Sequence, residues 1–359
     1  MYKSLVSPIL SRIDAEQAHF LSLQSLAALY RLPGSAAMLG RMFPVVEDAR
    51  LHTTAFGLTF RNPIGMAAGF DKTGVGAAAL ACLGFGSVEI GTVTPLPQPG
   101  RPKPRMFRLP KDQGLINRLG FPNQGAQTTL GILSPQQRHG SVRGVNIGPN
   151  MEHVEPDLAA RDCIVCLETL FDVADYFTIN ISSPNTTGLR SLQAKDALQR
   201  VLSIFFEAVG ERANAKPVLL KLSPDLSEQE LADMVEVASS YPIRGFIATN
   251  TTIERPPSLR GAASKETGGL SGKPLRARST EMIRLLYRLT GGRTPIIGVG
   301  GVFAVEDVVE KLRAGASLVQ LYTGMVYEGP GIARSLSLEL LGFMDREGVR
   351  SVSELVGTE

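Results

Sequence analysis

Short, almost wholly apolar runs alternate with helical patterns along the chain from about residue 60 onward. An apolar run of about four to eight residues, bounded by turn-forming residues, is typical of a strand buried on both faces. Helical segments between such strands indicate parallel β-α-β units. The predicted strands are 63–69, 87–93, 144–148, 176–182, 217–223, 245–250, 295–301 and 318–324.

Eight strands, helical patterns in most of the crossovers and a final helix after the last strand predict an α/β fold of the (β/α)8 TIM-barrel type. Helices are expected, for example, over 228–239 and 305–315. An open, doubly wound sheet is the alternative. The count of eight and the even spacing of the last four strands favour the barrel.

Residues 1–45 have a different pattern. The stretch 15–32 has the composition of a helix and is unusually apolar, and residues 2–13 predict a shorter helix whose start is limited or kinked by Pro8. One broad stripe at helical spacing contains Phe20, Leu23, Leu26, Ala27 and Tyr30. Such a pair of helices packs on the main domain or presents its apolar side to a membrane surface or an apolar ligand, and the pattern alone favours packing.

The composition is globular, with 43% apolar and 20% charged residues, and the net charge of +3 is too weak for a nucleic-acid-binding face. Neither a signal peptide nor an apolar stretch of about 20 residues is visible. The three cysteines form no disulfide framework, which indicates a reducing compartment. Cys163 and Cys166 form a C-x-x-C pair, but nothing completes a zinc site, so two apolar residues on one helix are favoured over a redox or metal site.

The active site of such a barrel forms at the carboxyl ends of its strands. A lysine inside an apolar strand is costly unless it is paired, so Lys221 is expected to face an anionic or electron-rich ligand, with a side chain that reaches solvent as the alternative. Amide side chains both donate and accept, which suits a ring with alternating carbonyl and N–H groups, such as a pyrimidine or an isoalloxazine. The candidates at or beside strand ends are Lys72, Thr92, Asn117, Asn146, Asn180, Asn185, Lys221, Thr249, Asn250, Gly300, Gly301, Tyr322 and Thr323.

Glycine clusters accompany the last strands of the predicted barrel. They are expected to free backbone N–H groups for an anion, so a phosphorylated ligand is predicted there. The clusters span 268–272, 298–301 and 322–324. Two further segments, 94–125 and 251–273, are too long for simple connectors and are expected to be functional.

Eight motifs in this chain resemble, in the same order, those of the quinone-dependent (class 2) dihydroorotate dehydrogenase family. They are AAGFDKTG, GFGSVEIGTVTPLPQPGRPKPRMFRL, GLINRLGFPNQG, NISSPNTTGLR, IATNTT, GGLSG, PIIGVGG and ASLVQLYTG. The resemblance runs from about Phe56 to about Pro330, and the N-terminal helices resemble that family's two-helix extension less specifically.

The resemblance implies oxidation of (S)-dihydroorotate to orotate in de novo pyrimidine (UMP) biosynthesis, with hydride transfer to N5 of FMN and electron transfer to a membrane quinone. Residues 46–359 would form the FMN-binding barrel, and residues 1–45 would form a helical segment for membrane contact and quinone access. It also implies a monomer bound peripherally (monotopically) to the cytoplasmic face of the cell membrane, with no nucleic-acid partner and no metal.

Site residues follow from the motifs of the family. FMN would be held by Ala68, Thr92, Asn146, Asn180, Lys221, Thr249, Gly272, Gly301, Tyr322 and Thr323. The substrate would contact Lys72, Asn117, Arg118, Leu119, Gly120, Phe121, Asn180, Asn185, Asn250 and Thr251.

The segment NISSPNTTGLR contains the residue that the resemblance assigns as the catalytic base, Ser183. No histidine lies near this segment in the sequence, and serine is a poor base at its ordinary pKa. We therefore expect a closed, dry loop in which Thr186 holds a water that relays the proton, while Ser182 is structural. Related cytosolic enzymes use a cysteine, so a serine indicates the membrane-associated branch.

In this family the two N-terminal helices form an apolar mouth for the quinone. Candidates for its lining are Phe20, Leu21, Leu23, Leu26 and Tyr30, and His19 and Arg108 are candidates to approach the head group. The rival interpretations are an NAD-linked flavin barrel, which would need an iron–sulfur partner or a cysteine cluster, and a barrel or membrane-bound module without redox activity.

Overall fold

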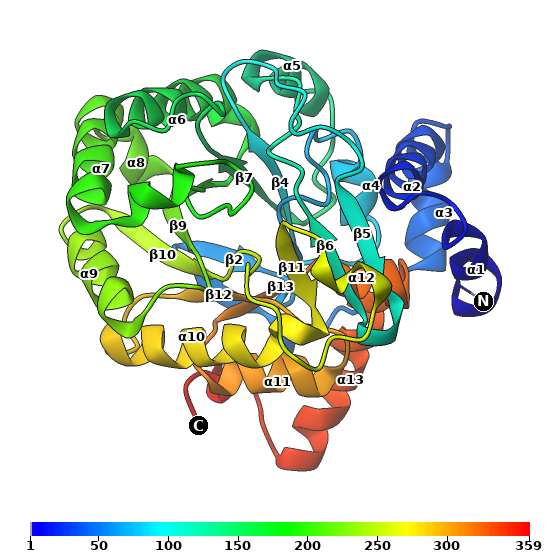
Figure 1. The fold of residues 1–359 in the computed structure, drawn as a ribbon. Helices are drawn as coiled ribbons and strands as arrows, with labels where there is room; N and C mark the ends of the chain where they lie inside the picture. Colours follow the sequence, from blue (N-terminus) through cyan, green and yellow to red (C-terminus); the bar gives the residue numbers. More distant parts are fainter. Residues whose placement is uncertain (1) are drawn as a thin grey trace.

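The computed structural model describes residues 2–359, so Met1, at the start of the predicted 1–45 segment, lies outside the described residues. Eight parallel strands close into a barrel in which neighbours in the ring are also successive barrel strands along the chain (Figure 1). The predicted (β/α)8 architecture is confirmed. Its strands are β3 (Ile64–Met66), β4 (Ser87–Val93), β7 (Val142–Ile147), β8 (Tyr176–Ile179), β9 (Val218–Leu222), β10 (Ile243–Ala248), β12 (Ile296–Val299) and β13 (Leu318–Leu321).

Helices surround this barrel and bury one face each (Figure 1). In α7 (Lys195–Val209), for example, the buried positions recur at helical spacing, as an amphipathic helix requires. Helix α9 (Glu228–Ser239) begins at a capping box between Ser227 and Glu230. The other helices around the ring are α4 (Ala77–Ala81), α5 (Ala126–Leu133), α6 (Pro156–Leu170), α8 (Arg212–Ala215), α10 (Arg276–Leu289), α11 (Val305–Arg313), α12 (Thr323–Glu328) and α13 (Ile332–Glu347).

The C-x-x-C pair lies on helix α6, where both Cys163 and Cys166 are fully buried and unbonded to each other. Burial raises the pKa of the Cys166 thiol well above its ordinary value, with Cys163 and Asp162 adding to the shift. This agrees with the interpretation of two apolar residues on one helix.

A polar cluster centred on Glu89 fills part of the barrel interior. One carboxylate oxygen accepts hydrogen bonds from the Tyr176 hydroxyl at 2.9 Å and the Gln320 amide at 3.0 Å, and the other accepts one from the Asn146 amide at 2.9 Å. Gly144 leaves the space for the Tyr176 ring, because a Cβ there would come within 2.2 Å of it. Through its bond to Glu89, the cluster fixes the Asn146 side chain on the side away from the carboxyl ends of the strands.

The two long segments build a small antiparallel sheet over the barrel mouth. Its strands are β5 (Met106–Leu109), β6 (Gly114–Asn117) and β11 (Gly269–Gly272), in the order β11–β6–β5. The glycine cluster at 268–272 was expected to free its backbone for an anion. Instead, Leu270 is paired on both sides: it lies opposite Ile116 in β6, and its N–H donates to the carbonyl of Thr252 at 2.7 Å. The sequence pattern concealed this strand because glycine has low strand propensity.

Helices at the N-terminus lie beside the barrel, next to α4 and β5 (Figure 1). A π-helical turn, Tyr2–Val6, runs into α1 (Ser7–Leu10), and α2 (Ala15–Tyr30) follows after an Asp14 N-cap. A third helix, α3 (Ser35–Met42), begins after Gly34 and was not predicted. We call residues 2–42 the helical extension. Within the described residues, no helix is both long and apolar enough to cross a bilayer.

Candidate active site

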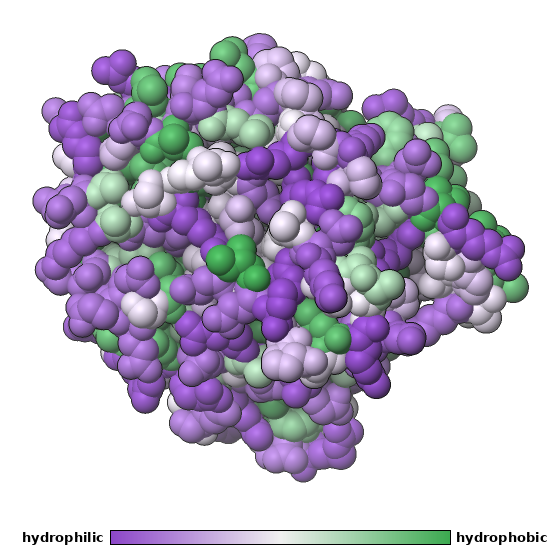
Figure 2. Space-filling model, viewed as in Figure 1, coloured by the Kyte–Doolittle hydropathy of each residue, from purple (hydrophilic) through white to green (hydrophobic). Residues whose placement is uncertain are grey.

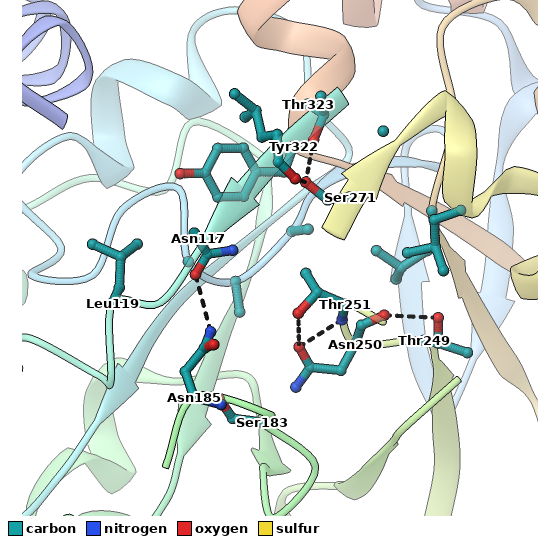
Figure 3. Close-up of a pocket in the computed structure, with 18 of the residues that line it drawn as sticks. Asn117, Leu119, Ser183, Asn185, Thr249, Asn250, Thr251, Ser271, Tyr322 and Thr323 are labelled. Atoms are coloured by element: carbon teal, nitrogen blue, oxygen red, sulfur yellow. Dashed lines mark hydrogen bonds between the residues drawn. The ribbon is translucent and has the colours of Figure 1, made fainter. Parts of the chain in front are cut away.

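The carboxyl ends of the barrel strands converge on one pocket beneath the small sheet (Figure 3). Most of the residues predicted from the sequence lie in its wall. They are Ala68, Lys72, Thr92, Asn117, Leu119, Gly120, Phe121, Asn180, Ser183, Asn185, Lys221, Thr249, Asn250, Thr251, Gly272, Gly301, Tyr322 and Thr323.

The five candidate asparagines lie close together, as predicted. They form two groups, and hydrogen bonds connect the members within each group. The Asn180 amide donates to Thr92 Oγ1 at 2.9 Å and to Asn146 Oδ1 at 3.0 Å, while its own Oδ1 accepts from the Asn250 amide at 3.2 Å. The Asn185 amide donates to Asn117 Oδ1 at 3.1 Å (Figure 3). These bonds fix the orientation of each amide, so the groups left over present a defined pattern of donors and acceptors to a planar ring.

Ser183 lies in the wall next to Asn185 and is 4% exposed. Its hydroxyl oxygen accepts a hydrogen bond from the Asn185 N–H at 3.2 Å. Thr186 is 3% exposed, and within the described chain its hydroxyl has no hydrogen-bond partner. A buried polar group without a partner is uncommon and indicates a water or ligand. Among the described residues, the pocket wall contains no histidine that could act as a base beside Ser183.

Two lysines give the pocket positive charge. Burial lowers the pKa of Lys72 from 10.5 to about 8, with Glu16 and Asp71 opposing the shift and Arg105 adding to it. The Lys72 ammonium donates to the carbonyl of Gly69. Lys221 at the end of β9 is 5% exposed, and burial lowers its pKa, opposed by Glu89. With a pKa of about 8, Lys72 carries charge at neutral pH in this largely buried pocket, which favours an anionic or electron-rich ligand beside it.

Glycines and hydroxyls gather at the other end of the pocket. The hydroxyls of Ser271 and Thr323 are 2.9 Å apart (Figure 3), and Gly272 and Gly301 lie in the wall nearby with positive φ angles of 92° and 75°. Hydroxyls and close-approaching glycines without a carboxylate among them suit a phosphate group.

The comparisons with known proteins agree on one family. A sequence model described as dihydroorotate dehydrogenase matches residues 50–344. The chain belongs to the dihydroorotate dehydrogenase family. A protein of Deinococcus deserti named dihydroorotate dehydrogenase (quinone) is 45% identical over the whole of both chains, and one of that name from Christiangramia forsetii is 46% identical over 95% of this chain and 99% of its own.

A solved structure gives the same result for the fold. The dihydroorotate dehydrogenase of Eimeria tenella in complex with ferulenol has a TM-score of 0.87 and 38% sequence identity, with 96% of this chain and 95% of the other covered. Enzymes of the dihydroorotate dehydrogenase family are flavin-dependent oxidoreductases, so the fit of this pocket to a flavin can be examined directly.

The pocket of this family member fits FMN by the chemistry of its wall. The wall offers amide and threonine groups at the ends of several strands, which suit a planar polar ring, and glycines with hydroxyls at the other end, which suit a phosphate. Within the described chain, two further wall atoms are buried without a partner, Oδ1 of Asn185 and the Tyr322 hydroxyl. Such atoms are expected where a ligand completes the hydrogen bonding.

A second cavity, of about 790 Å³, lies between the helical extension and the barrel. Its wall is mostly apolar and includes the His19 and Arg108 predicted for this region, together with Leu23 and Leu26. It shares the walls formed by Met106, Leu115 and Tyr322 with the first pocket. We call this cavity the apolar passage. In this dihydroorotate dehydrogenase family member, the apolar passage therefore borders the first pocket at these three shared residues.

Three residues predicted for the passage lie elsewhere. Phe20 and Leu21 are 59% and 50% exposed on the outer side of α2, and the Tyr30 hydroxyl contacts the His139 ring at 2.6 Å. The wall side of α2 is instead formed by smaller residues, Ala15, Ala18, His19 and Ser22, with Leu23 and Leu26. The prediction was wrong here because hydrophobicity alone did not distinguish a helix face against a cavity from one facing outward.

Three predicted site residues lie outside the immediate pocket wall. Asn146 supports the wall through Thr92 and Asn180, and Thr186 lies behind Ser183. The Arg118 guanidinium points away from the pocket, because it bonds to Glu266 at 2.7 Å and lies over the Phe107 ring. The wall also contains residues that were not predicted, among them Ser271, hidden in the GGLSG glycine cluster, and Met106, which looks like an ordinary apolar residue.

Proposed function

We propose that this chain oxidises (S)-dihydroorotate to orotate in de novo pyrimidine (UMP) biosynthesis and passes the electrons through bound FMN to a membrane quinone. The observation that carries the proposal is the shared wall of Met106, Leu115 and Tyr322 between the flavin-compatible pocket and the apolar passage. One side suits a polar ring and the other an apolar tail, as a reaction between dihydroorotate and a quinone requires. The names of the relatives support the same pair of substrates.

The substrate must lose a proton from C5 and a hydride from C6. Bound FMN would supply the hydride acceptor, its N5 atom, while the residues of the chain handle the proton. Ser183 accepts the proton from C5, and the buried, unpaired hydroxyl of Thr186 holds the water that carries it outward. The N–H bond from Asn185 leaves the proton of Ser183 free to be lost to that water.

Substrate binding falls to residues that present charge and amides. Lys72, Asn117, Asn185, Asn250 and Thr251 hold the pyrimidine ring and its carboxylate, with Leu119, Gly120 and Phe121 closing over it. Arg118 contributes only its backbone to this segment, since its side chain is engaged outside. Preorganised donors of this kind stabilise the negative charge that develops on a carbonyl during proton loss.

FMN would be held by Ala68, Thr92, Asn180, Lys221, Thr249, Gly272, Gly301, Tyr322 and Thr323 of the pocket wall. Lys221 would stabilise negative charge on the reduced flavin. Asn146 supports this set through Thr92 and Asn180.

The helical extension is proposed to hold the chain on the cytoplasmic face of the cell membrane as a monotopic monomer. Exposed apolar residues gather on its outer side, visible as green at the right edge of Figure 2. They are Leu5, Ile9, Phe20, Leu21, Leu32, Met38 and Met42. Apolar groups that enter the acyl boundary bind a membrane surface without spanning it.

An anaerobic titration tests the redox proposal. The purified protein is expected to be yellow, to bleach with dihydroorotate and to recover its colour when a long-tail quinone is added. A colourless protein from flavin-replete cells would contradict FMN binding. Bleaching that only NAD could reverse would favour the NAD-linked flavin barrel instead.

A further inference from the structure

Two arginines connect helix α2, which borders the apolar passage, to the loop that carries Ser183. We call residues 180–190 the catalytic loop. The Arg101 Nε atom donates to the carbonyl of Asn185 at 2.7 Å, and its Nη2 atom donates to the Thr187 hydroxyl at 2.7 Å. The two bonds lie on either side of Thr186. One guanidinium therefore holds the backbone of the segment that follows Ser183.

The position of Arg101 is itself fixed by Arg105. The Arg105 Nη1 atom donates to the carbonyls of both Pro99 and Arg101 at 2.7 Å, so it holds the chain on each side of Gly100. The Arg101 N–H also donates to the carbonyl of Leu119, within the segment that closes over the substrate. Arg105 is 8% exposed, so these bonds are little screened by water.

The other edge of Arg105 meets Glu16 in the first turn of α2. Nη2 lies 2.8 Å from Glu16 Oε1 and Nε lies 3.0 Å from Oε2, which is a bidentate pair. Burial raises the pKa of Glu16, but the hydrogen bond and charge of Arg105 outweigh it and the pKa is lowered. The carboxylate is therefore ionised at neutral pH, and the pair is intact where the enzyme works.

We propose that Arg101 and Arg105 are positioning residues through which helix α2 holds the catalytic loop in its reactive place. We call the link from Glu16 through Arg105 and Arg101 to the catalytic loop the arginine bridge. This rests on the proposed role of Ser183 as base. The physical reason is that proton removal needs Ser183 and its water aligned with C5, and a misplacement of about 1 Å can cost about a hundredfold in rate. Substrate oxidation then depends on the packing of the helical extension against the barrel, even when no quinone takes part.

Anaerobic stopped-flow reduction of the flavin by dihydroorotate measures this dependence, because quinone is absent. Arg101→Met is expected to slow flavin reduction roughly 10- to 100-fold. Arg101→Lys should recover part of that rate, since an ammonium can keep one of the two bonds. Glu16→Gln should slow reduction about tenfold or less, because Arg105 keeps its carbonyl bonds. Unchanged rates in Arg101→Met would overturn the proposal.

Two variants guard against a trivial loss of folding. Thr187 is exposed, and Thr187→Val removes only one acceptor, so this variant should fold normally and still slow flavin reduction severalfold. Lys103→Met is the matched control, because Lys103 is another cation near Glu16 but its ammonium is 3.7 Å away and 66% exposed. It should reduce flavin at the wild-type rate. A normal rate in Thr187→Val together with a slow Lys103→Met would contradict the bridge.

The Ser183→Ala background separates this proposal from the proposed function. Ser183→Ala alone should be about 10²- to 10⁴-fold slower, the usual contribution of a general base. Arg101→Met added to it should cause little further loss, since the base it positions is gone. Additive losses would mean that Arg101 acts through general stability. A normal rate in Ser183→Ala would overturn the role of the base, whereas a slow Ser183→Ala with a normal Arg101→Met would overturn the bridge alone.

Discussion

The rings of His19 and Tyr322 lie 5.9 Å apart between centroids, and Phe70 packs edge-on against both. His19 belongs to the helical extension, whereas Tyr322 belongs to the barrel and borders both cavities. This small aromatic group is where the flavin pocket meets the apolar passage. It also makes the extension part of the site itself, because α2 supplies one side of the contact.

The His19 ring is expected to act as a neutral hydrogen-bonding group. Its Nε2 lies 2.7 Å from the carbonyl of Phe70, which can only accept, so Nε2 carries the proton and Nδ1 can accept. Burial, with Lys72, lowers the pKa of His19 to about 4. His19→Phe should lower quinone-linked turnover up to about tenfold, the cost of one hydrogen bond. Flavin reduction by dihydroorotate should stay normal in His19→Phe. In the wild-type protein, quinone turnover should show no titration of His19 between pH 5.5 and 9, a range that begins about 1.5 pH units above its pKa.

Orotate binding should weaken in alkaline solution because Lys72 loses its charge. Its pKa of about 8 means that the ammonium is present below pH 8 and is lost as the pH rises through that value. The Kd for orotate, measured by the flavin difference spectrum, should rise up to about tenfold per pH unit above the pKa until the pKa of the complex is reached. Lys72→Gln should bind orotate weakly with a flat profile over the same range. An equally steep profile in Lys72→Gln would assign the titration to another group.

Lys311 should destabilise the fold at neutral pH. Its ammonium is fully buried between α10 and α11, where it donates hydrogen bonds to two hydroxyls of the described chain, Ser279 Oγ at 3.0 Å and Thr280 Oγ1 at 3.2 Å. Burial lowers its pKa from 10.5 to about 7, with Arg276 contributing, while Glu310 and Asp307 oppose the shift. Between these two values the unfolded chain binds more protons than the folded one, so this group makes stability rise with pH there.

Lys311→Met should therefore raise the free energy of unfolding at pH 7, by on the order of 1–3 kcal/mol. The gain should be constant below the folded pKa and shrink as the pH approaches 10.5. Urea unfolding at two pH values measures it. Lys195→Met is the control, because Lys195 forms an exposed pair with Glu236 and its removal should change stability little. A gain that does not shrink at alkaline pH would show that packing, not charge, is responsible.

Membrane association should depend on the outer face of α2. Phe20→Gln with Leu21→Gln removes two exposed apolar side chains that lie outside the apolar passage. Vesicle binding should weaken about tenfold or more, given roughly 1.5 kcal/mol or more for each buried side chain. Flavin reduction by dihydroorotate should be unchanged. Leu338→Gln, at an exposed apolar position on α13 away from the helical extension, is the control and should bind vesicles normally. Equal binding by all three proteins would argue against this surface.

Deleting residues 2–40 is expected to abolish both vesicle binding and quinone reduction, because it removes α2 and with it one wall of the apolar passage. The proposed arginine bridge adds that flavin reduction by dihydroorotate should also slow in this truncated protein, since Glu16 is lost. Normal use of a long-tail quinone by the truncated chain would contradict the passage.

The barrel was predictable from the sequence because its parallel strands are buried on both faces. Each strand therefore reads as a short, continuous apolar run. Asn180, Lys221 and Thr249 could be placed in the site because strand ends converge in any such barrel. The small sheet could not be predicted, since β11 is half glycine and pairs with a strand about 150 residues earlier. The sequence also could not predict that Phe20 faces away from the apolar passage, because two apolar faces of one helix look alike in sequence.

The pairing of β6 with β11 has a consequence for how the protein is made on the ribosome. The cover over the flavin pocket needs Gly269–Gly272 to meet Gly114–Asn117, and the pocket still lacks Gly301 and Thr323 at that point. Because domains fold as units once their parts have been synthesised, no partial chain up to Gly272 contains a complete flavin pocket. The proposed FMN would therefore enter last, after nine-tenths of the chain exists, and the yellow colour expected of the loaded protein would report that synthesis and closure are complete.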